Sequence, residues 1–294
     1  MREFKRCHPL VNAVYFLAVI GFSMFYMHPV YLGISLVSSL SCAFMTGRGK
    51  TLKSLGYLFL CALFAAALSP LFSHAGVTVL CYLPSGNPLT LESILYGAAS
   101  GVMFFSVMGW FFCFHRVMTG DKWMYLFGKV MPVFSLMLSM TLRFVPKYQR
   151  ELTAISHAQK GIGADAANKG MLQKAKSGTH MLSILVTRCF EDSVDTADSM
   201  KSRGYGLPGR TAFSNFLFTK RDRTILLLLL ILSLAVLICG VTRGAYFRYF
   251  PSIKGAAVSV KSLCGMVAYL MLSLTPVMIE GREAVRWKKL RSRI

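Results

Sequence analysis

Residues 224–242 read TILLLLLILSLAVLICGVT, an apolar run that contains no charged residue. A helix rises ~1.5 Å per residue, so about 20 such residues cross the ~30 Å hydrocarbon layer of a membrane. This stretch therefore predicts a transmembrane helix. The whole chain agrees with that prediction, because 54% of its residues are hydrophobic and only 15% are charged. Such a composition is typical of a protein whose main solvent is lipid.

Five more apolar windows have a similar length. They lie at about residues 10–27, 29–46, 54–72, 92–114 and 256–279. Together with 224–242 they predict an all-α integral membrane protein with about six transmembrane helices. Its eight cysteines form no CxxC pair, so neither a disulfide framework nor a metal site is expected.

The charges predict the orientation of these helices. The chain carries 33 Lys plus Arg against 12 Asp plus Glu, for a net charge of +21. Basic residues precede the first window and follow the second, the fourth and the last, whereas residues 73–91 carry no charge. Basic loops stay in the cytoplasm, so both termini are expected on the cytoplasmic side of a bacterial cytoplasmic membrane. The same rule accounts for the net positive charge of the chain, so nucleic acid is not expected as a partner.

The segment 143–223 contains twice as many basic as acidic residues and is expected in the cytoplasm. The apolar window before it, 124–142, would reverse that orientation if it crossed the membrane. Lys129 and Pro132 interrupt it, so we expect it to lie along the interface or to re-enter. Three regions result: helices 1–4 in residues 1–123, an interfacial and cytoplasmic helical domain in 124–223, and the last helices with a basic tail in 224–294.

Two amphipathic helices are predicted within this cytoplasmic segment. One follows Pro146 and stops at Gly161 and Gly163, and the other runs from about Met181 to Arg203. The second ends in Ser202, Arg203 and Gly204. An arginine before a glycine favours a simple helix cap, but at the tip of a cytoplasmic helix it is also suited to docking on a soluble partner.

The order of three motifs resembles a known family. They are LSMTLRFVP (138–146), AQKGIGAD (158–165) and ADSMKSRGYG (197–206), with weak support from HPLVN (8–12). They are similar to the coupling region of the transmembrane T component of energy-coupling factor (ECF) transporters, which import vitamins and metal ions. The resemblance implies a non-catalytic scaffold. Two ATP-binding-cassette ATPases would bind its cytoplasmic helices, and a substrate-binding S subunit would bind it in the membrane. ATP and Mg would be held by the ATPases, with no cofactor in this chain.

The resemblance also implies which residues contact the ATPases. In the family an Ala-Arg-Gly type motif ends each of two coupling helices. Ser202, Arg203 and Gly204 match the second motif, with serine in place of alanine. The first position reads Gly161, Ile162 and Gly163 and lacks the arginine. Nearby Lys160 cannot form the bidentate contacts of an arginine, so two unequal contacts are expected. Supporting positions are Arg143, Pro146, Ala158, Gln159, Asp165, Ala197 and Met200.

Two other functions remain open at this stage. Glu191, Asp192, Asp195 and Asp198 could hold a divalent cation in a membrane enzyme, although such a run is usually a solvated helix face. The chain could also be a secondary transporter that works alone. No acidic residue lies in the middle of a predicted span, which favours the scaffold, since ion-moving transporters need charged groups there. The sequence does not name the transported solute.

Overall fold

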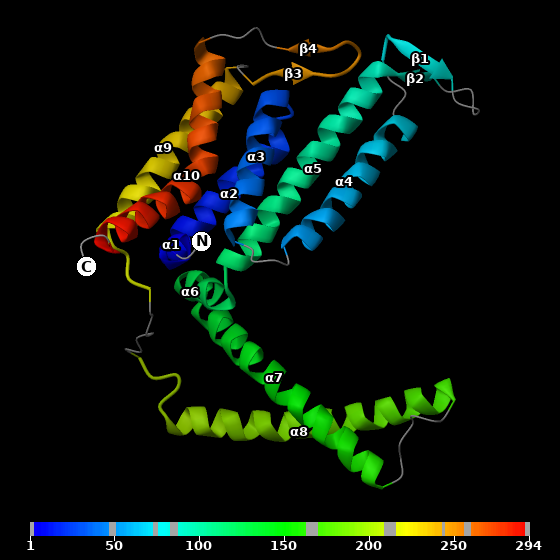
Figure 1. Cartoon of the computed structure of the whole chain (residues 1–294). Coiled ribbons are helices and arrows are strands. Elements are labelled where there is room, and N and C mark those ends of the chain that lie inside the picture. Colours follow the sequence, from blue (N-terminus) through cyan, green and yellow to red (C-terminus); the bar gives the residue numbers. More distant parts are fainter. Residues whose placement is uncertain are drawn as a thin grey trace. The chain divides into compact units, whose positions relative to one another are not determined.

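The structure is a computed structural model that describes residues 3–46, 51–72, 76–82, 88–162, 170–208, 216–242, 245–255 and 260–291. The chain forms two compact units. Unit 1 comprises Met1–Trp123 and Phe216–Ile294, and unit 2 comprises Met124–Asn215 (Figure 1). Nearly all regular structure in the described ranges is helical, which confirms the all-α fold class.

Unit 1 contains the apolar helices. They are α1 (Glu3–Arg6), α2 (Pro9–Phe25), α3 (Pro29–Thr46), α4 (Thr51–Phe72), α5 (Leu91–Val117), α9 (Lys220–Val241) and α10 (Val260–Arg291). In the described part of the chain, 5 of these helices are long and apolar enough to cross a membrane. The apolar helix α2 has 17 residues and reaches about 26 Å, slightly less than the hydrocarbon thickness. The chain is a multi-pass membrane protein.

Two short antiparallel hairpins join these helices, and the sequence analysis did not predict either (Figure 1). Strand β1 (Val79–Tyr82) pairs with β2 (Pro88–Thr90), and β3 (Phe247–Arg248) pairs with β4 (Lys254–Gly255). Both lie between the predicted apolar windows. Strands of two to four residues are too short for an alternating pattern to stand out in a sequence.

Small residues let α4 and α5 approach closely. A Cβ atom added to Gly97 would lie 2.6 Å from the carbonyl oxygen of Ala66, and one added to Gly101 would lie 2.7 Å from the Cβ of Ala66. Side chains do not fit at such distances, so these glycines set the spacing of the two helices. Gly97 and Gly101 therefore serve packing within the chain.

A hydrogen-bonded polar cluster lies inside unit 1. The hydroxyl of Ser35 is 2.7 Å from that of Ser23, which is 3.0 Å from the Tyr269 hydroxyl. The indole Nε1 of Trp110 donates to Ser35 at 3.0 Å. Because these four buried residues come from α2, α3, α5 and α10, the cluster joins four helices. Hence α10, to which the sequence assigned no role, is part of the core.

Unit 2 contains the end of α6 (Gly120–Val130), which includes the division between the units, and the long helices α7 (Pro132–Gly161) and α8 (Met171–Ser202). The predicted coupling motifs lie on α7 and α8 and just after their ends. The window 124–142 is thus split at Met131 between α6 and α7. A proline at the first helical position is well tolerated, because that position needs no N–H partner within the helix.

Both coupling helices begin earlier than the sequence analysis predicted. Helix α7 begins at Pro132 and continues through Pro146, and α8 begins at Met171 instead of Met181. An interior proline costs about 3 kcal/mol. Phe144 and Tyr148, on either side of Pro146, line a pocket together with Leu185 of α8. The earlier start of α8 places Gly178 inside the helix, where a glycine is tolerated at a cost of about 1 kcal/mol.

Candidate coupling site

The C-terminal end of α8 is fixed by a glycine cap. Gly204 has a φ of +78°, in the left-handed region where glycine is strongly favoured. Its N–H donates to the carbonyl of Lys201 at 2.9 Å, and the N–H of Tyr205 donates to the carbonyl of Met200 at 3.0 Å. These paired bonds satisfy carbonyls that the helix end leaves open. The backbone of Arg203, the capping residue, is therefore held in one conformation.

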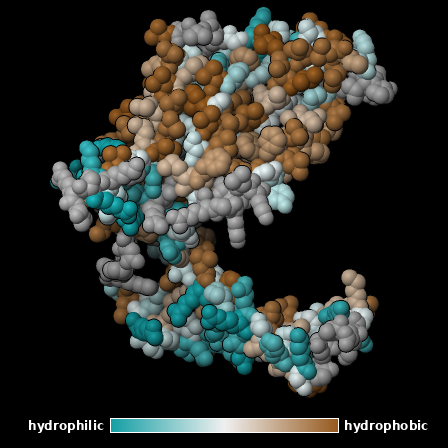
Figure 2. All heavy atoms as spheres, in the orientation of Figure 1, coloured by the Kyte–Doolittle hydropathy of each residue, from teal (hydrophilic) through white to brown (hydrophobic). Residues whose placement is uncertain are grey.

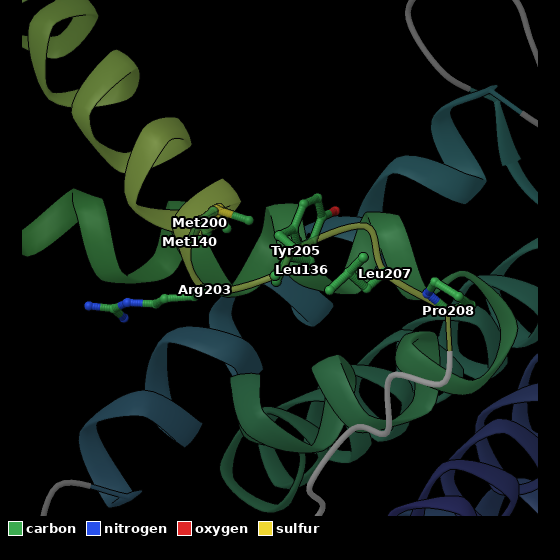
Figure 3. Close-up of a pocket in the computed structure, with 8 residues that line it drawn as sticks. Leu136, Met140, Met200, Arg203, Tyr205, Leu207 and Pro208 are labelled. Carbon is green, nitrogen blue, oxygen red and sulfur yellow. The ribbon is translucent and has the colours of Figure 1, made fainter.

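The side chains of the motif point in different directions. The hydroxyl of Ser202 donates to the carbonyl of Asp198 at 2.9 Å, so it is used inside the helix. The Arg203 side chain is exposed and extends away from its neighbours in Figure 3. Within the described residues no hydrogen bond or ion pair joins its guanidinium to another group. The cap is made by Gly204 and the backbone, which leaves all five guanidinium donors available.

An open pocket of about 470 Å³, with a mixed polar and apolar lining, lies beside this end of α8 (Figure 3). Its lining comes from Leu136 and Met140 on α7, from Met200 on α8, from Arg203 and Gly204 at the cap, and from Tyr205, Leu207 and Pro208 after it. The sequence analysis predicted Met200 but not the other apolar residues. The sequence feature that could have indicated some of these residues is the run YGLP (205–208), in which Gly206 also has a positive φ, of +98°.

Helices α7 and α8 pack antiparallel. Lys147 Nζ lies 2.6 Å from Asp192 Oδ2, and Arg188 Nη1 lies 3.0 Å from Glu151 Oε2. Between these ion pairs Tyr148 meets Cys189, and burial together with this contact raises the pKa of the tyrosine to about 12. Exposed ion pairs contribute only ~0–1 kcal/mol each, so they set the register more than they add stability.

The first predicted contact site lies at the other end of α7. Gly161 is the last helical residue, and the N–H of Ile162 donates to the carbonyl of Ala158 at 3.2 Å. The side chain of Ile162 is 77% exposed, and Lys160 is exposed beside it. Since Met140 lines the cavity near Arg203, about 21 residues of α7 separate the two sites, or ~30 Å along the helix.

The structure places the supporting positions as follows. Arg143 and Pro146 lie in the middle of α7, and Gln159 lies half-buried in its last turn beside Ala158. Ala197 is exposed, one turn before Met200. Gly163 and Asp165 lie outside the described residues. The predicted residues are thus divided between two separate sites and do not form one.

The acidic residues of α8 do not converge. Asp192 pairs with Lys147, while Glu191, Asp195 and Asp198 lie exposed along the helix. In the described ranges no group of three or more His, Cys, Asp or Glu side chains is placed to hold a metal ion. A solvated helix face with one interhelical ion pair accounts for this run.

Fold and site together define a multi-pass helical membrane protein with two long, antiparallel helices that are not among its candidate spans. A comparison with known proteins adds a more specific likeness. The chain is 35% identical over 104 residues to the energy-coupling factor transporter transmembrane protein EcfT of Lactococcus lactis. It is 37% identical over 100 residues to that of Streptococcus thermophilus, and 30% identical over 100 residues to that of Bacillus subtilis.

These similarities cover part of each protein. They span 34–35% of this chain and 38–39% of the length of the relatives. No family model matches the chain. Over about a third of its length, the resemblance to the T component of energy-coupling factor transporters is confirmed.

Proposed function

We propose that this chain is the non-catalytic transmembrane scaffold of an energy-coupling factor importer for a vitamin or another micronutrient. One observation carries the proposal. Arg203, inside the motif that resembles the family's ATPase contact, is exposed and extends from a fixed helix cap, and it lines a pocket together with apolar side chains of α7 and α8. A desolvated arginine surrounded by apolar contacts is a common centre of a protein interface. The similarity to relatives that are named as transporter membrane proteins supports the same function.

The proposed partners at the two ends of the α7–α8 pair are ATPase subunits, which bind ATP and Mg. The contact at Arg203 is the stronger one, because its guanidinium can bind a carboxylate or carbonyl pair with two parallel hydrogen bonds. The contact at Ile162 is mainly apolar, with Lys160 as a single point charge. A distance of ~30 Å between the sites leaves room for two separate subunits.

The third proposed partner is a substrate-binding subunit in the membrane. The helices of unit 1 offer it large apolar surfaces, and α4 is the most open of them. In the window Leu55–Phe72 only 11% of the residues are buried within the chain. In this arrangement unit 2 and both termini lie in the cytoplasm. ATP-driven movement of α7 and α8 reorients the substrate-binding partner.

Co-purification tests this function. The chain is expressed in its host with an affinity tag, and the ATPase activity that elutes with it is compared between variants. Arg203→Glu should reduce the retained ATPase and the uptake of the cognate solute by at least tenfold, because a lost interface arginine commonly costs more than about 2 kcal/mol. Arg150→Glu, on the exposed surface of α7, is the matched control and should retain both.

If the Arg203→Glu variant retained its ATPase and its uptake in full, Arg203 would not be part of the interface. A second outcome concerns the class of protein. The purified chain alone in liposomes should take up no solute, since recognition belongs to the partner. Uptake by the chain alone would instead support a secondary transporter.

A further inference from the structure

A cluster of basic residues lies where three helix ends of unit 1 meet. These are α1, the first turn of α9 and the last three turns of α10. They carry two, three and five basic residues respectively, against one, one and two acidic residues. We call this set the basic cluster. It consists of Lys5, Arg6, Lys220, Arg221, Arg223, Arg282, Arg286, Lys288, Lys289 and Arg291. Figure 2 shows hydrophilic atoms gathered at this edge of unit 1, beside the apolar surface of the spans.

The acidic residues of this region face inward and orient the cations outward. Glu3 Oε1 lies 3.0 Å from Arg6 Nη1, and the exposed fractions of the two side chains are 19% and 77%. Glu283 Oε1 lies 3.4 Å from Arg286 Nη1, with exposed fractions of 21% and 75%. Arg221 lies between the two carboxylates, at 3.7 Å and 4.0 Å. The surface that remains accessible is therefore strongly positive.

The two other acids of the region are also engaged. Glu280 Oε2 accepts a hydrogen bond from the backbone N–H of Glu3 at 3.2 Å. Asp222 accepts hydrogen bonds from the backbone and hydroxyl of Thr219, at 3.1 Å and 2.7 Å, and from the backbone N–H of His8 at 3.1 Å. It thus caps α9 and ties the start of α2 to it. Because Asp222 is 5% exposed, its charge is withdrawn from the surface.

The length of α10 brings its basic end to the edge of the hydrocarbon. Its 32 residues measure about 48 Å, whereas ~30 Å suffices to cross the hydrocarbon layer. Figure 1 shows the end of α10 turning away from the direction of its first half, and Pro276 within the helix accounts for such a change. The surplus of ~18 Å corresponds to the last three turns, which carry five of the basic residues.

Exposed apolar side chains accompany these charges. Trp287 is 60% exposed, and Val285 and Leu290 are 55% and 54% exposed on the same turns. Tryptophan concentrates at the boundary between headgroups and hydrocarbon, where its ring and its N–H are both accommodated. A helix with apolar and basic side chains that continues a span is suited to lie at that boundary.

We propose that the basic cluster binds the phosphate headgroups of anionic phospholipids, with the last three turns of α10 at the membrane interface and Trp287 inserted among the lipids. The charge of the cluster is complementary to that of the lipid, and its position at the ends of the spans matches the headgroup level. This proposal does not rest on the proposed function, since it requires only that unit 1 lies in a membrane.

Trp287 provides the probe for a test. The full chain is placed in vesicles that contain phosphatidylcholine and phosphatidylglycerol in equal amounts, with bromine atoms on the acyl chains of one lipid at a time. Bromine quenches nearby tryptophan, and subtracting the signal of a Trp287→Phe variant isolates this residue from Trp110 and Trp123. Each cation favours an anionic lipid by about fivefold, so brominated phosphatidylglycerol should report at least a fivefold enrichment at Trp287 in low salt.

Two further measurements make the result decisive. The first uses the unaltered chain. Raising the salt to about 1 M shortens the screening length to ~3 Å, so the enrichment of the anionic lipid at Trp287 should fall close to one. The triple variant Arg282→Gln, Arg286→Gln, Lys289→Gln should do the same in low salt. Its matched control, Arg150→Gln, Lys174→Gln, Lys176→Gln, removes the same charge from unit 2 and should keep the enrichment. Equal quenching by both lipids in the unaltered chain, or an enrichment that survives salt and the triple variant, would overturn the proposal.

Discussion

Replacing Gly204 by alanine tests whether the glycine cap holds Arg203 in place. At a φ of +78°, an L-residue with a Cβ pays about 1–2 kcal/mol relative to glycine. The new Cβ would also lie 3.0 Å from Leu207 Cδ1, a flexible contact that can move aside. The capped conformation should therefore become about 5- to 30-fold less populated relative to the frayed helix end.

Hydrogen exchange measures this change directly. The amides of residue 204 and Tyr205 are bonded to Lys201 and Met200 in the cap, so a peptide covering residues 200–208 should exchange 5- to 30-fold faster in Gly204→Ala by the same free energy. Gly178→Ala is the control within the same helix. A Cβ at Gly178 meets nothing within 4 Å, so that variant should stabilise α8 by about 1 kcal/mol.

The functional readout follows from the proposed docking. Gly204→Ala should retain less ATPase than the unaltered chain, although Arg203 itself is present, because the arginine would no longer be held in one place. Unchanged exchange over residues 200–208 would show that the positive φ of Gly204 does not maintain the cap. Faster exchange with full ATPase retention would instead show that docking does not need the cap.

Two further predictions concern unit 1. Ser35→Ala should lower the free energy of unfolding by about 1–3 kcal/mol, because it leaves the buried Trp110 N–H without its acceptor at 3.0 Å and removes one of the two hydroxyl partners of Ser23. A thermal melt followed by a thiol-reactive dye measures this change. Ser41→Ala, whose exposed hydroxyl bonds only to its own helix, should change the midpoint little. Burial lowers the pKa of Lys122 to about 8, so between about pH 8 and pH 10 the unfolded chain keeps a proton that the folded chain has lost. Stability should therefore rise with pH across that window, and a Lys122→Met variant should show a flatter profile; an identical rise in the variant would assign the pH dependence to another group.

The spans were predictable because a membrane imposes one simple rule. A helix must present about 20 apolar residues, and windows of that length mark the positions of α3, α4, α5, α9 and α10. The polar cluster was not predictable in the same way. Single serines such as Ser35 are common in apolar helices, and only the packed structure shows that Tyr269, far along the chain, lies beside Ser23.

The candidate site was partly predictable for a similar reason. Arg203 and Gly204 form a local motif, so their sequence indicates both the helix end and the left-handed glycine. The pocket that they line also depends on Leu136, about 67 residues earlier, and no local pattern links that residue to the motif. The beginning of α7 was misplaced because Pro146 reads as a helix start when the packing on both sides of it is unknown.

The two ends of the α7–α8 pair are unlike, and this has a mechanical consequence for the proposed function. The helices cross around Tyr148 and Cys189, with an ion pair on either side, whereas Arg203 and Ile162 lie toward different ends of α7. If two ATPases at these ends approach each other, the distance of ~30 Å between the contacts must change. Compressing a helix would break its backbone hydrogen bonds, whereas rotation of α7 against α8 about the crossing breaks at most two exposed ion pairs, at ~0–1 kcal/mol each. Under the proposed function the crossing is therefore the pivot.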